Sequence, residues 1–309
     1  MRYKSFITKL TAIVICVILM ITLSGCFASK QITLATLDTP EAVLASEIMA
    51  RQLENFGFEV VRGITYSSLA ELEAGMRGNE FDLSAVFLQD ALTGFDIIGE
   101  SPVYDQQLAT EIVNNTLHDV LGYVLLDWWS IDAQYTLAVR DNFIQGDLAG
   151  LGSLAFRAPG LTLAATEGFI DSALGMDHLR NLFWEIEFGN IVVVGYDDLF
   201  EPGNIDADVI ALRSTFVGDW LVNAGYTSIG QSSSRVDPVG FDGFAIWPQN
   251  NLVPVASDDL MERLPEVQAI LSSVSFQIDP STFARHLRHI NVGSQTPEQA
   301  AYEILQHRR

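Results

Sequence analysis

The amino-acid sequence predicts an α/β protein of two lobes, each a mixed β-sheet flanked by helices, joined by two hinge crossings. Its 309 residues exceed the size of one ordinary domain core. The chain also opens with a β-α-β-α-β pattern, which is typical of a sheet covered by helices, and a similar alternation begins again after about residue 140. We therefore assign residues 31–138 and 241–309 to lobe I and residues 139–240 to lobe II.

The first part of lobe I reads as alternating strands and helices. Residues 31–37 alternate in the manner of a half-buried strand. Pro40 suits the first turn of a helix, and apolar side chains then recur at helical spacing until Gly57 ends the pattern. The elements expected next are a strand at 58–61, a helix at 67–77, a strand at 81–87, a helix at 103–121 and a strand at 122–126.

Two linker-like stretches, Gly146–Gly152 and Gln231–Gly240, bracket a middle block of the chain. A block inserted into another lobe makes two crossings, which is the layout of a hinged protein that holds a ligand between its lobes. The strands expected in this half lie at 135–140, 161–165, 190–195, 208–212 and 252–256. The expected helices lie at 147–155, 169–183, 258–272, 280–290 and 297–307, the last three marked by prolines.

The N-terminus has the pattern of an export signal. A basic start and an apolar run from Leu10 to Leu23 precede Ser-Gly-Cys. The tetrapeptide at 23–26 resembles a bacterial lipobox, which implies a signal peptide at 1–25, lipidation of Cys26 and a short tether at 26–30. An uncleaved membrane helix is the alternative, since no charge occurs from residue 10 to residue 29. Both alternatives place the folded body outside the cytoplasm.

Composition excludes several classes of function. The net charge of −22 argues against nucleic acid, which requires a clustered basic surface. The remaining cysteine, Cys16, lies inside the predicted signal, so the mature body would contain neither a disulfide nor a thiolate metal site. No nucleophile elbow, phosphate loop, dinucleotide fingerprint or zinc-protease motif occurs. We therefore expect no enzyme, no cofactor and no metal, although composition alone leaves a two-carboxylate hydrolase open.

Short sequence stretches follow one another in a particular order along residues 31–307. They include Gly-Asn-Glu-Phe-Asp-Leu at 78–83, Ala-Leu-Thr at 91–93, Tyr-Thr-Leu-Ala-Val-Arg at 135–140 and Val-Pro-Val at 253–255. In order and spacing they resemble the substrate-binding proteins of glycine betaine/choline/carnitine ABC importers. The resemblance implies a type II periplasmic-binding-protein-like fold.

The resemblance also implies a ligand site. In that family aromatic rings surround a quaternary ammonium group, which donates no hydrogen bond and is attracted by ring faces. This chain departs from the family at three tyrosine positions, which carry Phe87, Arg213 and Asn251. Arg213 precedes Ser214 and Thr215, and an arginine repels a bare cation but binds a carboxylate.

Further candidates come from the residues around the predicted crossings and turns. Trp129 and Tyr135 offer rings, although a tryptophan at such a place more often packs in the core. Glu167 and Phe169 lie at a strand-to-helix turn, where backbone amides favour anions or simply begin a helix. The candidate ligand-binding residues are Phe87, Trp129, Tyr135, Glu167, Phe169, Arg213, Ser214, Thr215 and Asn251.

The sequence thus predicts an extracytoplasmic solute-binding lipoprotein of an ABC importer. Its expected ligand is a small zwitterionic or quaternary ammonium solute of the glycine betaine, choline or proline betaine type. Its expected partners are the permease and ATPase subunits, and the membrane through the N-terminal lipid. The alternatives are a ligand-sensing lipoprotein that binds a small carboxylate or amino acid without transport, and an exported hydrolase.

Overall fold

The computed structural model describes residues 30–95, 97, 102–144, 151–182, 186–229, 246–275 and 277–306. The predicted signal peptide and Cys26 lie outside the described residues. So do the linker-like stretch 231–240 and most of the one at 146–152.

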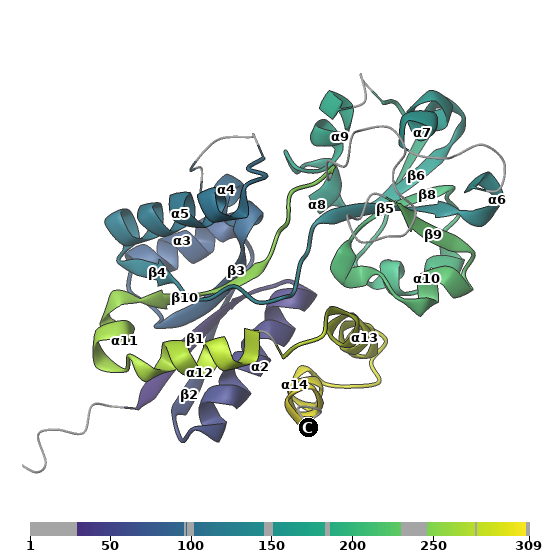
Figure 1. The fold of residues 1–309 in the computed structure, drawn as a ribbon. Helices are drawn as coiled ribbons and strands as arrows, with labels where there is room; N and C mark the ends of the chain where they lie inside the picture. The colour runs from purple at the N-terminus through teal and green to yellow at the C-terminus, as the bar shows by residue number, and fades with distance from the viewer. Residues whose placement is uncertain are drawn as a thin grey trace, which may run out of the picture.

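The first lobe is built on a five-stranded sheet with strand order β2-β1-β3-β10-β4. Strand β1 runs parallel to β2 and β3, whereas β10 runs antiparallel to β3 and β4, so the sheet is mixed as predicted. In Figure 1 the strands lie side by side although β10 comes from near the end of the chain. The strands are β1 (Gln31–Leu37), β2 (Glu59–Tyr66), β3 (Leu83–Phe87), β4 (Tyr123–Leu125) and β10 (Leu252–Ser257).

Helices cover both faces of this sheet, with α3, α4 and α5 on one side and α2 and α12 on the other (Figure 1). Helix α2 begins as predicted, because Thr39 caps it by accepting from the Ala42 amide and Pro40 occupies the first turn. The helices of this lobe are α2 (Pro40–Asn55), α3 (Leu69–Arg77), α4 (Leu88–Gly94), α5 (Gln106–Thr116), the π-helical turn η1 (Leu117–Leu121), α11 (Asp258–Arg263) and α12 (Glu266–Ser275).

The second lobe is built on another five-stranded mixed sheet, with order β7-β6-β8-β5-β9. Strand β5 pairs antiparallel with β8 from its first residue, Tyr135. Residues 135–138, predicted to end lobe I, therefore belong to lobe II, because alternation identifies a strand but not the sheet it joins. The strands are β5 (Tyr135–Arg140), β6 (Thr162–Ala165), β7 (Asn190–Val193), β8 (Val209–Arg213) and β9 (Tyr226–Ile229).

The predicted helix at 169–183 is two helices. A turn separates them at Gly175, where a Cβ atom would lie 1.9 Å from the carbonyl oxygen of Phe169. The chain therefore folds back on itself at a position that only glycine fits. The helices of lobe II are α6 (Asp141–Ile144), α7 (Leu151–Arg157), α8 (Glu167–Ile170), α9 (Met176–Leu182) and α10 (Asp219–Asn223), with 3-10 turns η2 (Ala158–Gly160), η3 (Asp197–Phe200), η4 (Pro202–Asn204) and η5 (Ser214–Phe216).

Two chain segments run side by side between the lobes, at 126–134 and 246–251 (Figure 1). They are tied together by an isolated antiparallel bridge between Asp132 and Asn251 and by the Asp132 carboxylate, which accepts from the Asn250 amide at 2.8 Å. The two crossings are therefore joined to each other where they connect the lobes.

The chain ends in helices α13 (Pro280–Asn291) and α14 (Pro297–Gln306), which contact both lobes. Helix α14 packs on α2 of lobe I, while α13 packs on η5 and η3 of lobe II. The Arg288 guanidinium lies 5.6 Å from the ring centroid of Trp220, and its Nε donates to the Phe200 carbonyl oxygen. These helices therefore form a further link between the lobes.

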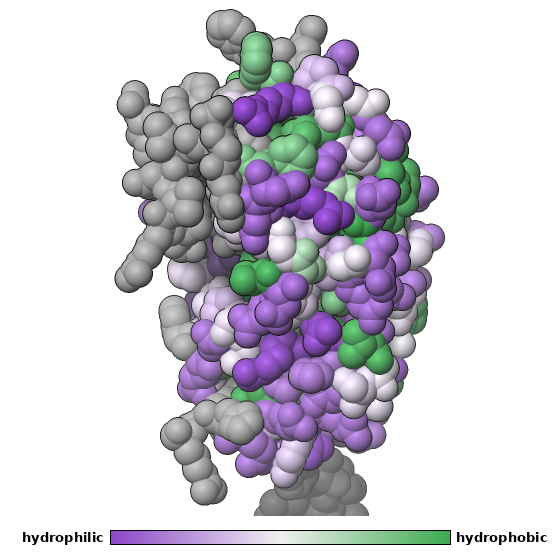
Figure 2. Space-filling model, turned by 90° about the vertical axis from the view of Figure 1, so that its right-hand side faces the viewer, coloured by the Kyte–Doolittle hydropathy of each residue, from purple (hydrophilic) through white to green (hydrophobic). Residues whose placement is uncertain are grey.

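The side of the molecule turned toward the viewer in Figure 2 carries hydrophobic patches set among hydrophilic residues. The most exposed large apolar side chain in the described ranges is Phe156, at 88%.

Within those same ranges, no helix combines the length and the apolar character needed to cross a bilayer.

Candidate ligand-binding site

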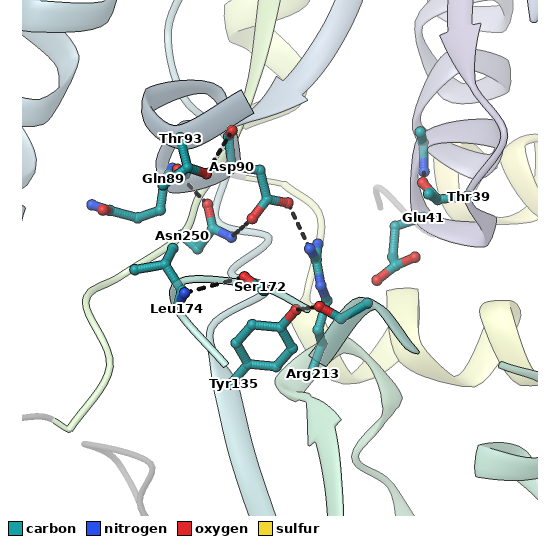
Figure 3. Close-up of polar contacts among 12 residues, drawn as sticks. Thr39, Glu41, Gln89, Asp90, Thr93, Tyr135, Ser172, Leu174, Arg213 and Asn250 are labelled. Carbon is teal, nitrogen blue, oxygen red and sulfur yellow. Dashed lines mark hydrogen bonds and ion pairs between the residues drawn. The ribbon is translucent and has the colours of Figure 1, made fainter. Parts of the chain in front are cut away.

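Arg213 lies where the two lobes meet. It is the last residue of β8, and its register partner on the neighbouring strand β5 is Tyr135. In α/β folds, ligands bind outside the carboxyl ends of parallel strands. The carboxyl end of β3, followed by α4, faces Arg213 from lobe I (Figure 3).

An ion pair joins the lobes at this point. Arg213 Nη2 lies 2.6 Å from Oδ2 of Asp90, in the first turn of α4. The other carboxylate oxygen of Asp90 accepts from Asn250 Nδ2 at 3.0 Å, and Asn250 Oδ1 accepts from the Gln89 amide at 2.8 Å. Figure 3 shows this chain of contacts from α4 to Arg213. Asp90 is thus held with one oxygen directed at Arg213.

Two aromatic rings flank the same guanidinium. Its central carbon lies 5.3 Å from the ring centroid of Phe87 and 5.5 Å from that of Tyr135. These separations are within the range of cation–π attraction. The Arg213 guanidinium therefore lies close to both rings, which would otherwise be available to another cation.

A second carboxyl group lies beside this pair. Glu41, in the first turn of α2, is only 1% exposed and accepts from the Thr215 hydroxyl at 3.1 Å. Burial raises the pKa of Glu41 above its usual value, while the positive charge of Arg213 opposes the rise. The proton-bearing form of Glu41 is therefore favoured over a wider pH range than in an exposed glutamate.

Arg213 keeps its proton and its positive charge. Burial alone would lower the pKa of its guanidinium, but the negative charge of Asp90 and other neighbours raise it well above the usual value. Tyr196 also interacts with Arg213, and burial raises its pKa to about 12. The site therefore contains one fixed cation, Arg213, with Asp90 as its partner and with Glu41 and the Tyr196 hydroxyl nearby.

Residues behind Tyr135 fix its position, and one of them, Phe169, was predicted. The Phe169 ring meets the Tyr135 ring edge to face at 5.0 Å, and Trp247 lies 6.5 Å away on another side. The Tyr135 hydroxyl donates to the Gly168 carbonyl oxygen at 3.2 Å. Phe169 is fully buried and so supports the site through Tyr135.

The structure does not bring every predicted residue to this pair. Trp129 is fully buried in the core, where its carbonyl oxygen accepts from Asn251 Nδ2. Asn251 also accepts from Gln106 Nε2, so its amide joins one crossing to the other and to helix α5. Ser214 donates to the Asp132 carbonyl oxygen, and Glu167 is exposed at the start of α8. Phe87, Tyr135, Arg213 and Thr215 form the site, with Phe169 behind them.

Asp90, Asn250 and Tyr196 were not among the predicted site residues, and neither was Glu41. Asp90 follows an apolar strand by three residues, at the carboxyl end where ligand groups gather, and this signal was available. Asn250 and Tyr196 reach the site only through the tertiary arrangement, so no local pattern identifies them.

A second polar contact closes the space between the lobes. The Tyr104 hydroxyl, just before α5, donates to the Ile246 carbonyl oxygen at 2.7 Å and lies 3.1 Å from His178 Nε2 of α9. The two lobes thus touch across a charged, ring-lined site.

Among the described residues, no group of three or more His, Cys, Asp or Glu side chains is placed to hold a metal ion.

A family model matches the C-terminal part of the chain. Residues 202–307 match the model of the substrate binding domain of the ABC-type glycine betaine transport system. The resemblance predicted from the sequence is confirmed. The matched stretch is about a third of the chain and includes Arg213 and Thr215, so this part of the sequence is similar to a glycine betaine-type substrate-binding domain. Proteins of this family bind solutes for ABC transporters and are not a class of enzymes.

Solved structures share the whole fold. Apo YehZ from Escherichia coli is 14% identical, with 90% of this chain and 98% of that chain covered and a TM-score of 0.66. A glycine betaine/carnitine/choline ABC transporter structure is 15% identical, with 89% and 98% covered and a TM-score of 0.71. A choline binding protein in complex with choline is 12% identical, with 90% and 89% covered and a TM-score of 0.56.

At these identities the likeness shows the fold alone, and it confirms the predicted two-lobed α/β architecture. No curated protein sequence matches the chain.

Proposed function

We propose that this glycine betaine-type domain captures a small zwitterionic solute between its lobes outside the cytoplasm. The protein then delivers the solute, chemically unchanged, to the permease and ATPase subunits of an ABC importer. The observation that carries this proposal is the partly buried Arg213–Asp90 pair, which contributes one charge of each sign from opposite lobes.

Charge balance favours a zwitterion over a simple ion. A lone cation placed between Phe87 and Tyr135 would meet the guanidinium that already lies there. A lone anion brought to Arg213 would leave Asp90 without its partner in a partly buried site, and an uncompensated buried charge is costly. A zwitterion supplies a partner to each residue and leaves the net charge of the site unchanged.

The same pair gives closure a physical cause. A solute that contacts Arg213 from one lobe and Asp90 from the other binds best when the lobes are together, so it selects the closed state. The proposed location is the extracytoplasmic face of the cell membrane. The predicted lipid on Cys26 would keep the protein near its permease and raise its local concentration there.

A thermal-shift screen tests this proposal. The panel contains zwitterions (amino acids and betaines), simple cations such as choline, and simple carboxylates such as acetate. A ligand present at 100 times its dissociation constant stabilises the folded state by about 2.7 kcal/mol, which raises the melting temperature. We expect the hits to be zwitterions, and calorimetry followed by mass spectrometry should recover each hit with its mass unchanged. Exclusive binding of simple ions, or steady formation of a product, would contradict the proposal.

A further inference from the structure

The ring pair of the site already holds a cation that belongs to the chain. Arg213 and Tyr135 are register partners on adjacent strands, so the guanidinium is confined beside this ring by the sheet itself. Tyr135 is fixed in turn by Phe169 and by its hydrogen bond to Gly168. A trimethylammonium group would gain these rings only if the guanidinium left them.

The contacts of the Arg213 guanidinium hold it within the site. Its side chain is 16% exposed and forms a 2.6 Å charge-assisted contact with Asp90. Moving it away from both rings and from Asp90 without replacing its partner would leave a poorly solvated carboxylate. The cationic group of the solute must therefore find its main partner elsewhere.

That partner is the Asp90 carboxylate. Oδ1 is fixed by Asn250, which is itself held by the Gln89 amide, so Oδ2 keeps its direction when the guanidinium turns to a new anion. The carboxylate of a solute can take the place of Asp90 beside Arg213. The positive group of the same solute can then take the place of Arg213 beside Asp90.

We infer that the solute binds by exchanging partners with the Arg213–Asp90 pair, and that its cationic group is an ammonium with N–H bonds rather than a quaternary ammonium. A carboxylate recognises an ammonium by charge-assisted hydrogen bonds, which a trimethylammonium cannot donate. Burying an acceptor without a donor costs free energy that ring contact would have to offset. This inference rests on the proposed function and narrows its ligand to amino or imino acids.

The test measures affinity along an N-methylation series, because methylation removes donors while the charge stays constant. The tightest-binding protein amino acid from the screen is compared by calorimetry with its N-methyl, N,N-dimethyl and N,N,N-trimethyl derivatives. The pairs glycine with glycine betaine and proline with proline betaine are measured alongside. We expect the trimethyl compound to bind at least about tenfold more weakly than its parent, which is the effect of losing about 1.4 kcal/mol.

The possible outcomes separate this inference from the proposed function. If a betaine binds as tightly as its parent amino acid or more tightly, the inference is overturned while zwitterion capture stands. If no member of the series binds, the proposed function fails, and the inference fails with it. Because the series uses the unaltered protein, the result does not depend on the folding of any variant.

A variant then assigns the ammonium to Asp90. The change Asp90→Asn keeps an oxygen for Asn250 and removes the charge that would hold the ammonium. We expect the affinity for the best amino acid to fall at least tenfold and the affinity for its trimethyl derivative to change less than threefold. An equal loss for both compounds would show that Asp90 does not contact the ammonium. Asp177→Asn, in the exposed pair with Arg180, is the matched control and should change neither affinity.

Discussion

Arg213 stands between two rings and against a carboxylate, and each of these neighbours would also suit a bound cation. In the proposed function this one side chain therefore decides which solutes are accepted. Its positive charge excludes a simple cation from the rings and at the same time offers a fork for a carboxylate. A single arginine at a family tyrosine position thus changes the expected ligand while the fold is kept.

Replacing this side chain should remove the anion contact. We expect Arg213→Ala to weaken the binding of a carboxylate-bearing solute by at least about 30-fold, which corresponds to losing about 2 kcal/mol from a buried charge contact. Calorimetry with the best zwitterion from the screen measures the loss. Arg180→Ala, which breaks an exposed ion pair, is the control and should change affinity by less than about twofold. Unchanged affinity in Arg213→Ala would place the ligand elsewhere.

Glu41 predicts a pH dependence of stability. Burial raises the pKa of Glu41 above its usual value of 4.5, so between these two pKa values the folded protein keeps a proton that the unfolded chain releases. Stability should therefore fall as pH rises above about 4.5, and the loss should end above the folded-state pKa. The limiting slope for one proton is about 1.4 kcal/mol per pH unit.

Glu41→Gln isolates this effect, because glutamine resembles the protonated form and cannot lose the proton. Measured by denaturant unfolding of the ligand-free proteins, the stability of the variant relative to the parent should increase with pH across that window and then level off. Parallel stability curves for the two proteins from pH 4.5 upward would show that Glu41 does not carry the dependence.

Half of the charge pair could be predicted from the sequence. Arg213, Phe87, Tyr135 and Thr215 lie at or next to strand ends, where sequence order and spacing identify positions that face a ligand. Asp90 lies at the carboxyl end of β3, where a ligand group could have been expected, but its contacts with Arg213 and Asn250 form only where two lobes and a crossing come together. Trp129 was predicted to contact the ligand but is buried in the core. The sequence around a large ring near a crossing is the same in both cases, so it could not separate them.

At the scale of elements, most strands were predicted and the irregular elements were not. In strands such as β1 and β6 the apolar residues either alternate with polar ones or form a short continuous run, and both patterns predict a strand directly. Strand β9 and helix α4 were missed, because both are short and α4 follows β3 without a break. The break at Gly175 depends on contact with Phe169 and so could not be seen in helical spacing.

Helix α13 is the element that links the C-terminal region to lobe II, and its start depends on one cap. The Asp279 side chain accepts from the Thr282 amide at 2.8 Å. Asp279→Ala should lower the free energy of unfolding by about 1 kcal/mol, the usual contribution of an N-cap. Denaturant unfolding measures the change, and Asp177→Ala on α9 is the exposed control, expected to cost less than about 0.5 kcal/mol. Equal effects of the two changes would show that the cap contributes nothing specific.

At the scale of the whole molecule, the two lobes and their crossings have the arrangement on which the proposed closure around a solute depends. The lobes touch through the Arg213–Asp90 pair and through Tyr104, while the paired crossings at 126–134 and 246–251 connect them below. In the proposed closure the charges of the site would be removed from water, and in a low-dielectric setting they would interact more strongly with a zwitterion than they do in water.

The proposed membrane anchor is tested on the full chain. If Cys26 is the lipid site, Cys26→Ala should leave the precursor uncut and without lipid, because the acylated cysteine is the expected first residue of the mature protein. Mass spectrometry of the membrane fraction measures both changes, and Cys16→Ala inside the apolar run is the matched control that should mature normally. Normal processing and acylation of the Cys26 variant would contradict the anchor.

The most direct measurement of the central claim is a crystal structure with the tightest-binding zwitterion. The account predicts one ligand molecule between the lobes, with its carboxylate within about 3 Å of the Arg213 guanidinium and its cationic group against Asp90. The direct contact between Arg213 and Asp90 should be replaced by these two contacts. A ligand bound elsewhere, with the Arg213–Asp90 pair undisturbed, would contradict the account.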